Sequence, residues 1–158
     1  MPMVNVWAPK GALSAEQQAS LSDKLTHALL LIEGRMNKEI HNLAALSIAW
    51  VLFHEVEPSG WAIGGRLDDT YTPEGGRFLT VVTVPGGALD HEGAKPAVVE
   101  TVHAAFREIL GLPAKTKGTY WAPWLIIQEV PEGNWGAGGV IRHLKEIGAY
   151  AMEGVPAL

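Results

Sequence analysis

The chain opens on the stretch that decides its fold, Pro2-Met3-Val4-Asn5-Val6-Trp7-Ala8-Pro9-Lys10-Gly11. From Met3 to Ala8, apolar residues alternate with polar or small ones, as in a β-strand with one buried face. A capping box, Ser14-Ala15-Glu16-Gln17, then predicts the start of a helix. Apolar residues at helical spacing follow as far as Gly34, where a left-handed C-cap is expected to end this helix.

A second strand is predicted over Ala45 to Val56, which is apolar along almost its whole length and is therefore expected to be buried on both faces. A turn at Pro58-Ser59-Gly60 leads to Trp61-Ala62-Ile63-Gly64-Gly65, a short apolar piece suited to a hairpin. The helix between the two strands is long enough to connect them in parallel, by a right-handed crossover. The first part of the chain is thus predicted to form one β-α-β unit with a hairpin at its end.

The second half of the chain repeats these elements in the same order. The strand-end motif Val6-x-x-Pro9-x-Gly11-Ala12-Leu13 returns as Val82-x-x-Pro85-x-Gly87-Ala88-Leu89. A second set of residues, from the long strand and the hairpin after it, also returns: Trp50, Glu55-Val56, Trp61 and Gly64-Gly65 match Trp124, Glu129-Val130, Trp135 and Gly138-Gly139. We interpret the chain as one domain built from two tandem repeats, with a first unit over 1–66, a linker over 67–77, a second unit over 78–139 and a C-terminal tail over 140–158.

The predicted fold class is α+β, with a four-stranded sheet and two helices on one of its faces. The strands are expected over four segments: Pro2 to Ala8, Ala45 to Val56, Phe78 to Val84 and Trp124 to Val130. The second helix should begin near Ala94 rather than after Asp90, because Pro96 would otherwise lie inside it and displace a backbone hydrogen bond. The tail from Val140 to Met152 is expected to form a short helix, because Val140, Leu144 and Ile147 fall at helical spacing, and residues 153–158 are expected to be loose.

Composition excludes several classes of function. The 158 residues contain no cysteine, so disulfides, thiolate nucleophiles and thiolate metal sites are excluded. The net charge of −5, without a basic block, argues against a nucleic-acid partner. No apolar run reaches about 18 residues and the N-terminus lacks the layout of a signal peptide, so we expect a cytoplasmic protein with no membrane partner. We also expect no metal and no cofactor, since His54-Glu55 and His91-Glu92 lack the closing histidine of a zinc-binding helix.

Three features together resemble a known family. They are the Met1-Pro2 start on a strand, the Ser-Ala-Glu-Gln entry to the first helix, and the motif Glu-Val-x-x-x-x-Trp-(Ala/Gly)-x-Gly-Gly, which ends at Gly65 and again at Gly139. With them the chain resembles the tautomerase superfamily, founded on 4-oxalocrotonate tautomerase, in the double-length form of cis-3-chloroacrylic acid dehalogenase, malonate semialdehyde decarboxylase and macrophage migration inhibitory factor. The resemblance implies a homotrimer, with Pro2 in a pocket between its strand, a hairpin and the adjacent subunit.

Pro2 is the candidate catalytic residue on chemical grounds as well. Once Met1 is removed, its nitrogen is a free secondary amine; an α-amine titrates near ~8, and an apolar pocket or nearby cations lower that value. Such an amine can take a proton from beside a carbonyl and return it elsewhere, which is tautomerisation, whereas a protonated amine is a general acid for water addition. If Met1 stays, Pro2 is an amide without a basic nitrogen. The matching residue of the second unit, Phe78, lies inside the chain and has no amine.

The chain departs from the family where substrate carboxylates are bound. The positions that carry arginine in relatives read Ala12 and Ala88 after the strands, and Trp50 and Trp124 on the long strands. The candidate substrate-binding residues are therefore Lys10, Trp50, His54, Trp61, Trp124 and Trp135. Each has a second interpretation: Lys10 as a solvated loop cation, His54 as a polar group at a strand end, and the tryptophans as core or subunit interface.

The sequence thus predicts a cofactor-independent, tautomerase-like enzyme that acts through Pro2 on a small molecule, an enol or keto acid. Two alternatives stay open. One is a non-catalytic trimeric binding or signalling module of the same fold, and the other is a hydratase, dehalogenase or decarboxylase that uses the same proline.

Overall fold

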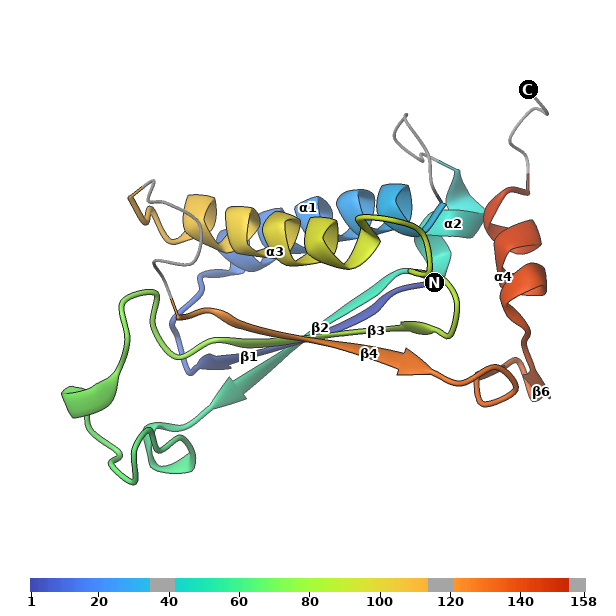
Figure 1. The fold of residues 1–158 in the computed structure, drawn as a ribbon. Coiled ribbons are helices and arrows are strands. Elements are labelled where there is room, and N and C mark those ends of the chain that lie inside the picture. Colours follow the sequence, from blue (N-terminus) through green and yellow to red (C-terminus); the bar gives the residue numbers. More distant parts are fainter. Residues whose placement is uncertain (35–41, 114–120, 154–158) are drawn as a thin grey trace.

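The computed structural model describes residues 1–34, 42–113 and 121–153. Its main sheet has four strands in the order β2-β1-β3-β4: β1 (Met3–Pro9), β2 (Trp50–Val56), β3 (Leu79–Pro85) and β4 (Trp124–Val130). β1 is parallel to β2 and β3 is parallel to β4, while the two central strands, β1 and β3, are antiparallel. Two long helices, α1 (Ala15–Gly34) and α3 (Ala94–Ile109), lie together on one face of this sheet (Figure 1). The predicted α+β class and its layout, with two helices on one face, are confirmed.

Shorter elements lie at the two ends of the sheet. At the end that holds the N-terminus are α2 (Leu43–Ser47), α4 (Leu144–Ala151) and the hairpin of β5 (Gly136–Ala137) with β6 (Val140–Ile141). The 3-10 turns η1 (Pro58–Gly60) and η2 (Asp69–Tyr71) lie at the opposite end (Figure 1). Within these three described segments, none of the helices combines the length and apolar character needed to span a bilayer.

The ends of the long helices follow the signals in the sequence except at Gly34, which is the last helical residue of α1 and lacks the positive φ expected of a left-handed C-cap. Ser14 and Gln17 form the predicted capping box, in which the Ser14 hydroxyl accepts the Gln17 N–H (3.2 Å) and Gln17 Oε1 accepts the Ser14 N–H (2.9 Å). α3 begins at Ala94, as predicted, and it ends just before Gly111, whose φ of +64° is the left-handed conformation of a C-cap. The tail helix, α4, begins only at Leu144, and the prediction of a helix from Val140 is wrong, because Val140 and Ile141 pair with β5 as β6. The predictions for the segment directly after Gly34 and for the end of the tail fall on residues 35–41 and 154–158, outside the described residues.

The prediction of one long strand buried on both faces is wrong in two respects. Residues Leu43–Ser47 form α2, which is capped by Asn42, whose Oδ1 accepts the N–H of Ala45 (2.7 Å). β2 begins only at Trp50, and along it exposed residues alternate with half-buried ones. A short apolar run is compatible with a helix as well as with a strand, so the pattern did not separate them. The helices also cover only one face of the sheet, which leaves the other face of β2 open within the chain.

The two halves of the chain make equivalent hydrogen bonds. The N–H of Trp50 donates to the carbonyl of Pro2 (3.0 Å), and the N–H of Trp124 donates to the carbonyl of Phe78 (2.9 Å). Pro2 and Phe78 thus occupy corresponding places, each directly before a central strand. The unit boundaries that we drew from the repeat stay a prediction.

The Gly-Gly turns of the two halves differ in the structure that they close. In the second half, β5 pairs with β6 around Gly138 and Gly139, whose φ angles of +63° and +80° suit glycine. In the first half, the turn at Gly64-Gly65 is closed by a single bridge between Ile63 and Arg66. The predicted hairpin is therefore a two-stranded element only in the second half.

The core lies between the sheet and the two long helices. Alternate residues of the central strands, such as Val6 and Val82, face the helices and pack against Leu25, Val98 and Phe106, and all five are fully buried. The opposite face of the sheet, which we call the helix-free face, carries apolar side chains that are between 38% and 64% exposed: Trp50, Leu52, Trp124 and Ile126. The chain by itself therefore covers only one side of its sheet.

The predicted linker is a loop held from inside by one arginine. The side chain of Arg77 is 8% exposed. Its guanidinium donates hydrogen bonds to the carbonyls of Trp61 (3.0 Å) and Leu67 (3.1 Å). It also donates to three groups around η2: the Asp68 carbonyl, the Asp69 carboxylate and the Thr72 hydroxyl. This single side chain therefore satisfies five acceptors around the loop that leads into β3.

Replacing this arginine is expected to destabilise the fold. Arg77→Gln should lower the free energy of unfolding by about 3 kcal/mol, because several partly buried acceptors would lose their donor. Urea denaturation measures the change. Arg66→Gln, which alters an exposed arginine of the same loop, should cost much less, and equal losses in the two variants would contradict the role assigned to Arg77.

Candidate functional site

Pro2 is held at the start of β1 and is almost completely buried. Less than 2% of its surface is exposed, and its carbonyl oxygen accepts the N–H of Trp50 (3.0 Å). A proline is tolerated directly before a strand because no N–H is needed there for the ladder. The sheet thus fixes the position of the residue that the sequence marks as the candidate catalytic group.

A cavity of about 390 Å³ lies beside Pro2. Its walls come from the starts of β1 and β2, the end of β3 and the segment that follows β4. They are mostly apolar, with Trp50 and Trp135 as the largest side chains, while Thr83 and Asn134 contribute a hydroxyl and an amide. Such a volume fits a small molecule. Among the described residues, no cluster of three or more histidine or acidic side chains is placed to hold a metal ion.

The central antiparallel pair brings the two halves together at this cavity. Met3 of β1 lies opposite Thr83 of β3, so the start of β1 meets the ends of β3 and β4. The hairpin segment that carries Trp135 therefore adjoins Pro2. The corresponding segment of the first half follows β2 and lies at the other end of the sheet (Figure 1).

Three of the six predicted substrate-binding residues lie at that other end. Lys10, roughly 26 Å from Pro2 at about 3.3 Å per strand residue, pairs through Nζ with Glu57 Oε1 at 2.6 Å. Trp124 begins β4 and is 64% exposed on the helix-free face. Trp61 follows η1, and its carbonyl accepts from the arginine that holds the linker.

His54 lies towards the same end of β2 and is occupied by contacts within the sheet. Its ring stacks on Trp7 with 4.7 Å between centroids, and its Nε2 is 2.8 Å from Asn5 Oδ1. Within one chain, the structure therefore places Trp50 and Trp135 with Pro2 and leaves Lys10, His54, Trp61 and Trp124 outside the cavity. That these six residues bind a substrate stays a prediction.

A buried carboxylate that the sequence analysis did not select lies next to the N-terminus. Glu33, in the last turn of α1, forms an ion pair through Oε2 with the amino group of Met1; the two side chains are only 8% and 11% exposed. Its Oε1 is buried and has no hydrogen-bond partner in the described structure. Burial raises the pKa of Glu33, and the adjacent ammonium opposes that shift. The sequence signal that could have identified Glu33 is an acidic residue in the last turn of a predicted helix, where the helix dipole disfavours a negative charge.

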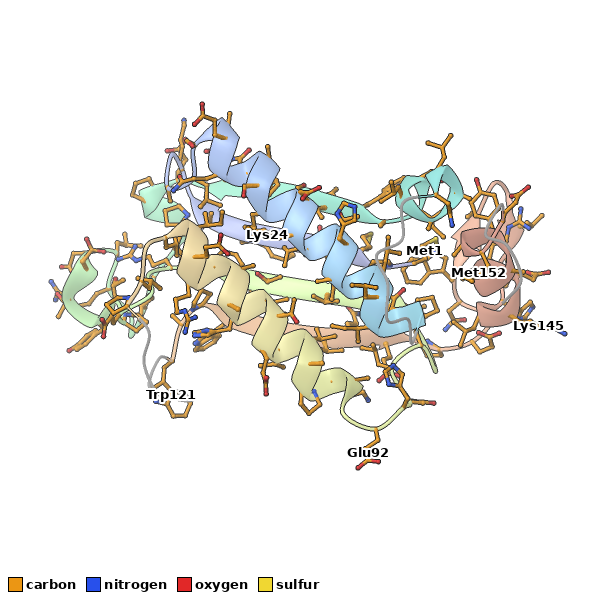
Figure 2. All side chains as sticks on the ribbon, turned by 90° about the horizontal axis from the view of Figure 1, so that it is seen from above. Met1, Lys24, Glu92, Trp121, Lys145 and Met152 are labelled. Atoms are coloured by element: carbon orange, nitrogen blue, oxygen red, sulfur yellow. The ribbon has the colours of Figure 1, made fainter. Side chains whose placement is uncertain are left out.

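A second cavity, of about 310 Å³, adjoins the first. Met1, Ile48 and Ala137 line both cavities, so Met1 forms part of the wall between them. In Figure 2, Met1 lies at the end of the sheet that is close to α4. Arg142 and Tyr150 line the second cavity, and within the described part of the chain Arg142 has no ion-pair partner. Arg142 follows the second hairpin and lies outside both repeats, so no repeated motif pointed to it.

Comparison with known proteins gives matches among solved structures. No protein-family model matches the chain, and no curated protein sequence matches it. The structure of native fused 4-OT covers 88% of this chain and 94% of its own, at 21% identity and a TM-score of 0.66. N1, a member of the cis-3-chloroacrylic acid dehalogenase family, covers 98% and 92% at 17% identity and a TM-score of 0.66. Macrophage migration inhibitory factor of Toxoplasma gondii covers 89% and 99% at 16% identity and a TM-score of 0.59.

These matches confirm the expected resemblance at the level of the fold. The matched proteins are tautomerase-superfamily members, and each aligns with most of this chain. At identities of 21% or less, the property that they share with this chain is the fold. The chain therefore has the fold of the tautomerase superfamily.

Proposed function

We propose that this chain is a tautomerase-like enzyme that needs no cofactor and uses the amine of Pro2, freed when Met1 is removed, on a small enol or keto acid. The observation that carries the proposal is the position of Pro2, buried in the wall of a largely apolar cavity of about 390 Å³. Apolar walls lower the pKa of an amine and a nearby carboxylate raises it, so this site has the means to set the protonation of Pro2. In either form the amine can transfer a proton.

In the proposed reaction, a proton moves between the Pro2 nitrogen and the carbon beside the substrate carbonyl. The electron pair of the broken C–H bond moves to the carbonyl oxygen, which becomes an enol when it is protonated; ketonisation is the reverse. The Thr83 hydroxyl and the Asn134 amide line the same cavity and can donate hydrogen bonds to the oxygen on which negative charge develops. Trp50 and Trp135 form the apolar walls around the reacting carbon.

Arg142 is proposed to bind the substrate carboxylate, in place of the arginines that the strands lack. It lines the cavity on the other side of Met1, so removal of Met1 would open the shared wall between Pro2 and the guanidinium. A guanidinium binds a carboxylate through two parallel hydrogen bonds. Glu146 lines the same cavity, where its Oε2 accepts the backbone N–H of His143 at 3.0 Å.

The proposal includes a homotrimer in which neighbouring copies cover the helix-free face. The exposed apolar side chains of that face lie on the two edge strands, β2 and β4, and apolar surface of this kind is typical of an interface. Fused 4-OT proteins are described as asymmetric and symmetric trimers. Binding roles for Lys10, His54, Trp61 and Trp124 require such a neighbouring copy, because within one chain these residues lie away from Pro2.

A second candidate function is a non-catalytic trimeric binding module. The lack of arginine at Ala12, Ala88, Trp50 and Trp124 supports it, and a chain that keeps Met1 would have no basic nitrogen at Pro2. A hydratase or decarboxylase is a third candidate, which would use the same proline in its protonated form.

Replacing Pro2 separates the enzyme from the binding module. Pro2→Ala is expected to lower kcat/KM for ketonisation of phenylenolpyruvate by about 10²-fold or more, the usual size of a general acid–base contribution. Loss of enol absorbance measures the rate, and intact mass shows whether Met1 is absent. Pro58→Ala, at the exposed start of η1, should keep full activity. Equal rates for the wild type and Pro2→Ala would exclude the enzyme, and a chain that retains Met1 would favour the binding module.

Replacing Arg142 tests the carboxylate site. Arg142→Gln should raise KM for phenylenolpyruvate by about 10- to 100-fold, because a charged hydrogen-bonded pair is lost, while kcat changes little. Steady-state kinetics give both constants. Lys145→Gln removes an exposed charge three residues away and should leave KM unchanged. An unaltered KM in Arg142→Gln would show that the carboxylate binds elsewhere.

The assembly can be checked by light scattering after size-exclusion chromatography. The wild type is expected to have the mass of three chains, and Ile126→Glu is expected to shift it towards the mass of one chain, because it places a charge in an apolar interface. Val99→Glu, at a 47% exposed position of α3, should leave the trimer intact. A wild type with the mass of a single chain would overturn this part of the proposal.

A further inference from the structure

Glu33 is a buried carboxylate that has one cation beside it and a second oxygen with no partner. Its side chain is 8% exposed, its Oε2 meets the amino group of Met1, and its Oε1 accepts no hydrogen bond in the described structure. It also lies in the last turn of α1, where the helix dipole adds to the unfavourable charge. A carboxylate in such a place is tolerated when a cation is held against it. The terminal ammonium is the cation that the fold supplies.

Removal of Met1 changes which nitrogen carries that charge. The new terminus is the amine of Pro2, which follows Met1 directly and lies within about 4 Å of the old terminus along the backbone. The Pro2 carbonyl accepts the N–H of Trp50, which holds Pro2 directly before Met3, the first paired residue of the sheet. The carboxylate then loses one ammonium and gains another in nearly the same place.

We infer that Glu33 is the counterion of Pro2 in the processed chain and keeps its amine protonated at neutral pH, so that Pro2 acts as a general acid; this inference rests on the proposed function. Glu33 does not line either cavity, so it acts through Pro2 as a positioning residue. The apolar walls of the cavity act on the pKa of the amine in the opposite sense to the carboxylate.

The protonated amine determines which substrate form the resting enzyme can act on. The proton on the Pro2 nitrogen passes to the nucleophilic carbon of an enol, the double bond shifts to the carbonyl, and the enol hydroxyl proton restores the amine. No other reactant is needed. The substrate class is therefore a small enol acid, whose carbon receives a proton and whose enol hydroxyl returns one.

Few other ionisable groups surround this pair. On the loop before α3, His91 Nε2 lies 2.9 Å from the carbonyl of Ile32, next to Glu33. On the α4 side, three residues line the cavity that Met1 also lines: Arg142, Glu146 and Tyr150. The ion pair with the terminus is made by Glu33, whereas Glu146 is engaged with the backbone of its own helix.

The pKa of Pro2 tests the inference directly. In protein labelled with ¹⁵N-proline and shown by mass to lack Met1, NMR titration of the terminal nitrogen gives this pKa without any turnover. Removing an anion next to an ammonium favours the neutral amine, so Glu33→Gln should lower the pKa of Pro2 by about 1 or more. The alkaline limb of the kcat/KM profile should move to lower pH by the same amount. Glu16→Gln, in the first turn of the same helix, removes an equal charge and should move neither.

The measured pKa of Pro2 in the wild type and in the Glu33 variants decides whether the inference holds. A pKa of Pro2 that is the same in the wild type and Glu33→Gln, or one below neutrality in the wild type, would overturn the inference. If Glu33→Gln fails to fold, Glu33→Asp withdraws the carboxylate by one methylene and should lower the pKa of Pro2 by a smaller amount; no change there would also overturn it. The proposed function fails separately, if Pro2→Ala keeps full activity whatever the pKa of Pro2.

Discussion

The antiparallel pairing of β1 with β3 is the interaction on which the rest of this structure depends. Each half of the chain forms its own parallel strand pair, and the central pair joins the two into one sheet. Because the pair is antiparallel, the first residues of one half meet the last strand residues of the other. Pro2 therefore shares a cavity with Trp135 of the second half and lies far from Trp61 of its own half.

The same arrangement explains why the two ends of the sheet differ. The halves are equivalent in their backbone bonds, yet only the first has a chain terminus at its strand start. At that end the terminal ammonium meets the buried carboxylate of Glu33, and Arg142 of the tail faces an adjoining cavity. At the other end, Phe78 is an internal residue, and its ring centroid lies 5.4 Å from that of Phe106. The loop at that end is organised around Arg77. One end therefore has a chain terminus beside a buried carboxylate, whereas the ion pairs of the other end, such as Arg66 with Asp68, belong to its loop.

Much of the fold could be predicted because it follows local and repeated patterns. The capping box at Ser14, the late start of α3 and the order of strands and helices are all set by neighbours in the sequence. The extent of β2 could not be predicted in this way, since α2 and β2 are both apolar and differ only in how they pack. Of the cavity, Pro2, Trp50 and Trp135 are on strand starts or in the repeated hairpin. No motif marks the other residues of interest: Thr83 and Asn134 in the same cavity, Arg142 in the second cavity, and Glu33 beside the terminus.

The sequence by itself determined the order of the four main strands and the two long helices, the repeated motifs, and the presence of one proline that can become a terminal amine, because these depend on spacing along the chain. The tertiary structure alone decided what surrounds that proline. Burial and ion pairing depend on which distant segments the central strands bring together, and no pattern within one segment records that. The place of Glu33 beside the terminus, and of Lys10 and His54 away from it, follows from this long-range packing.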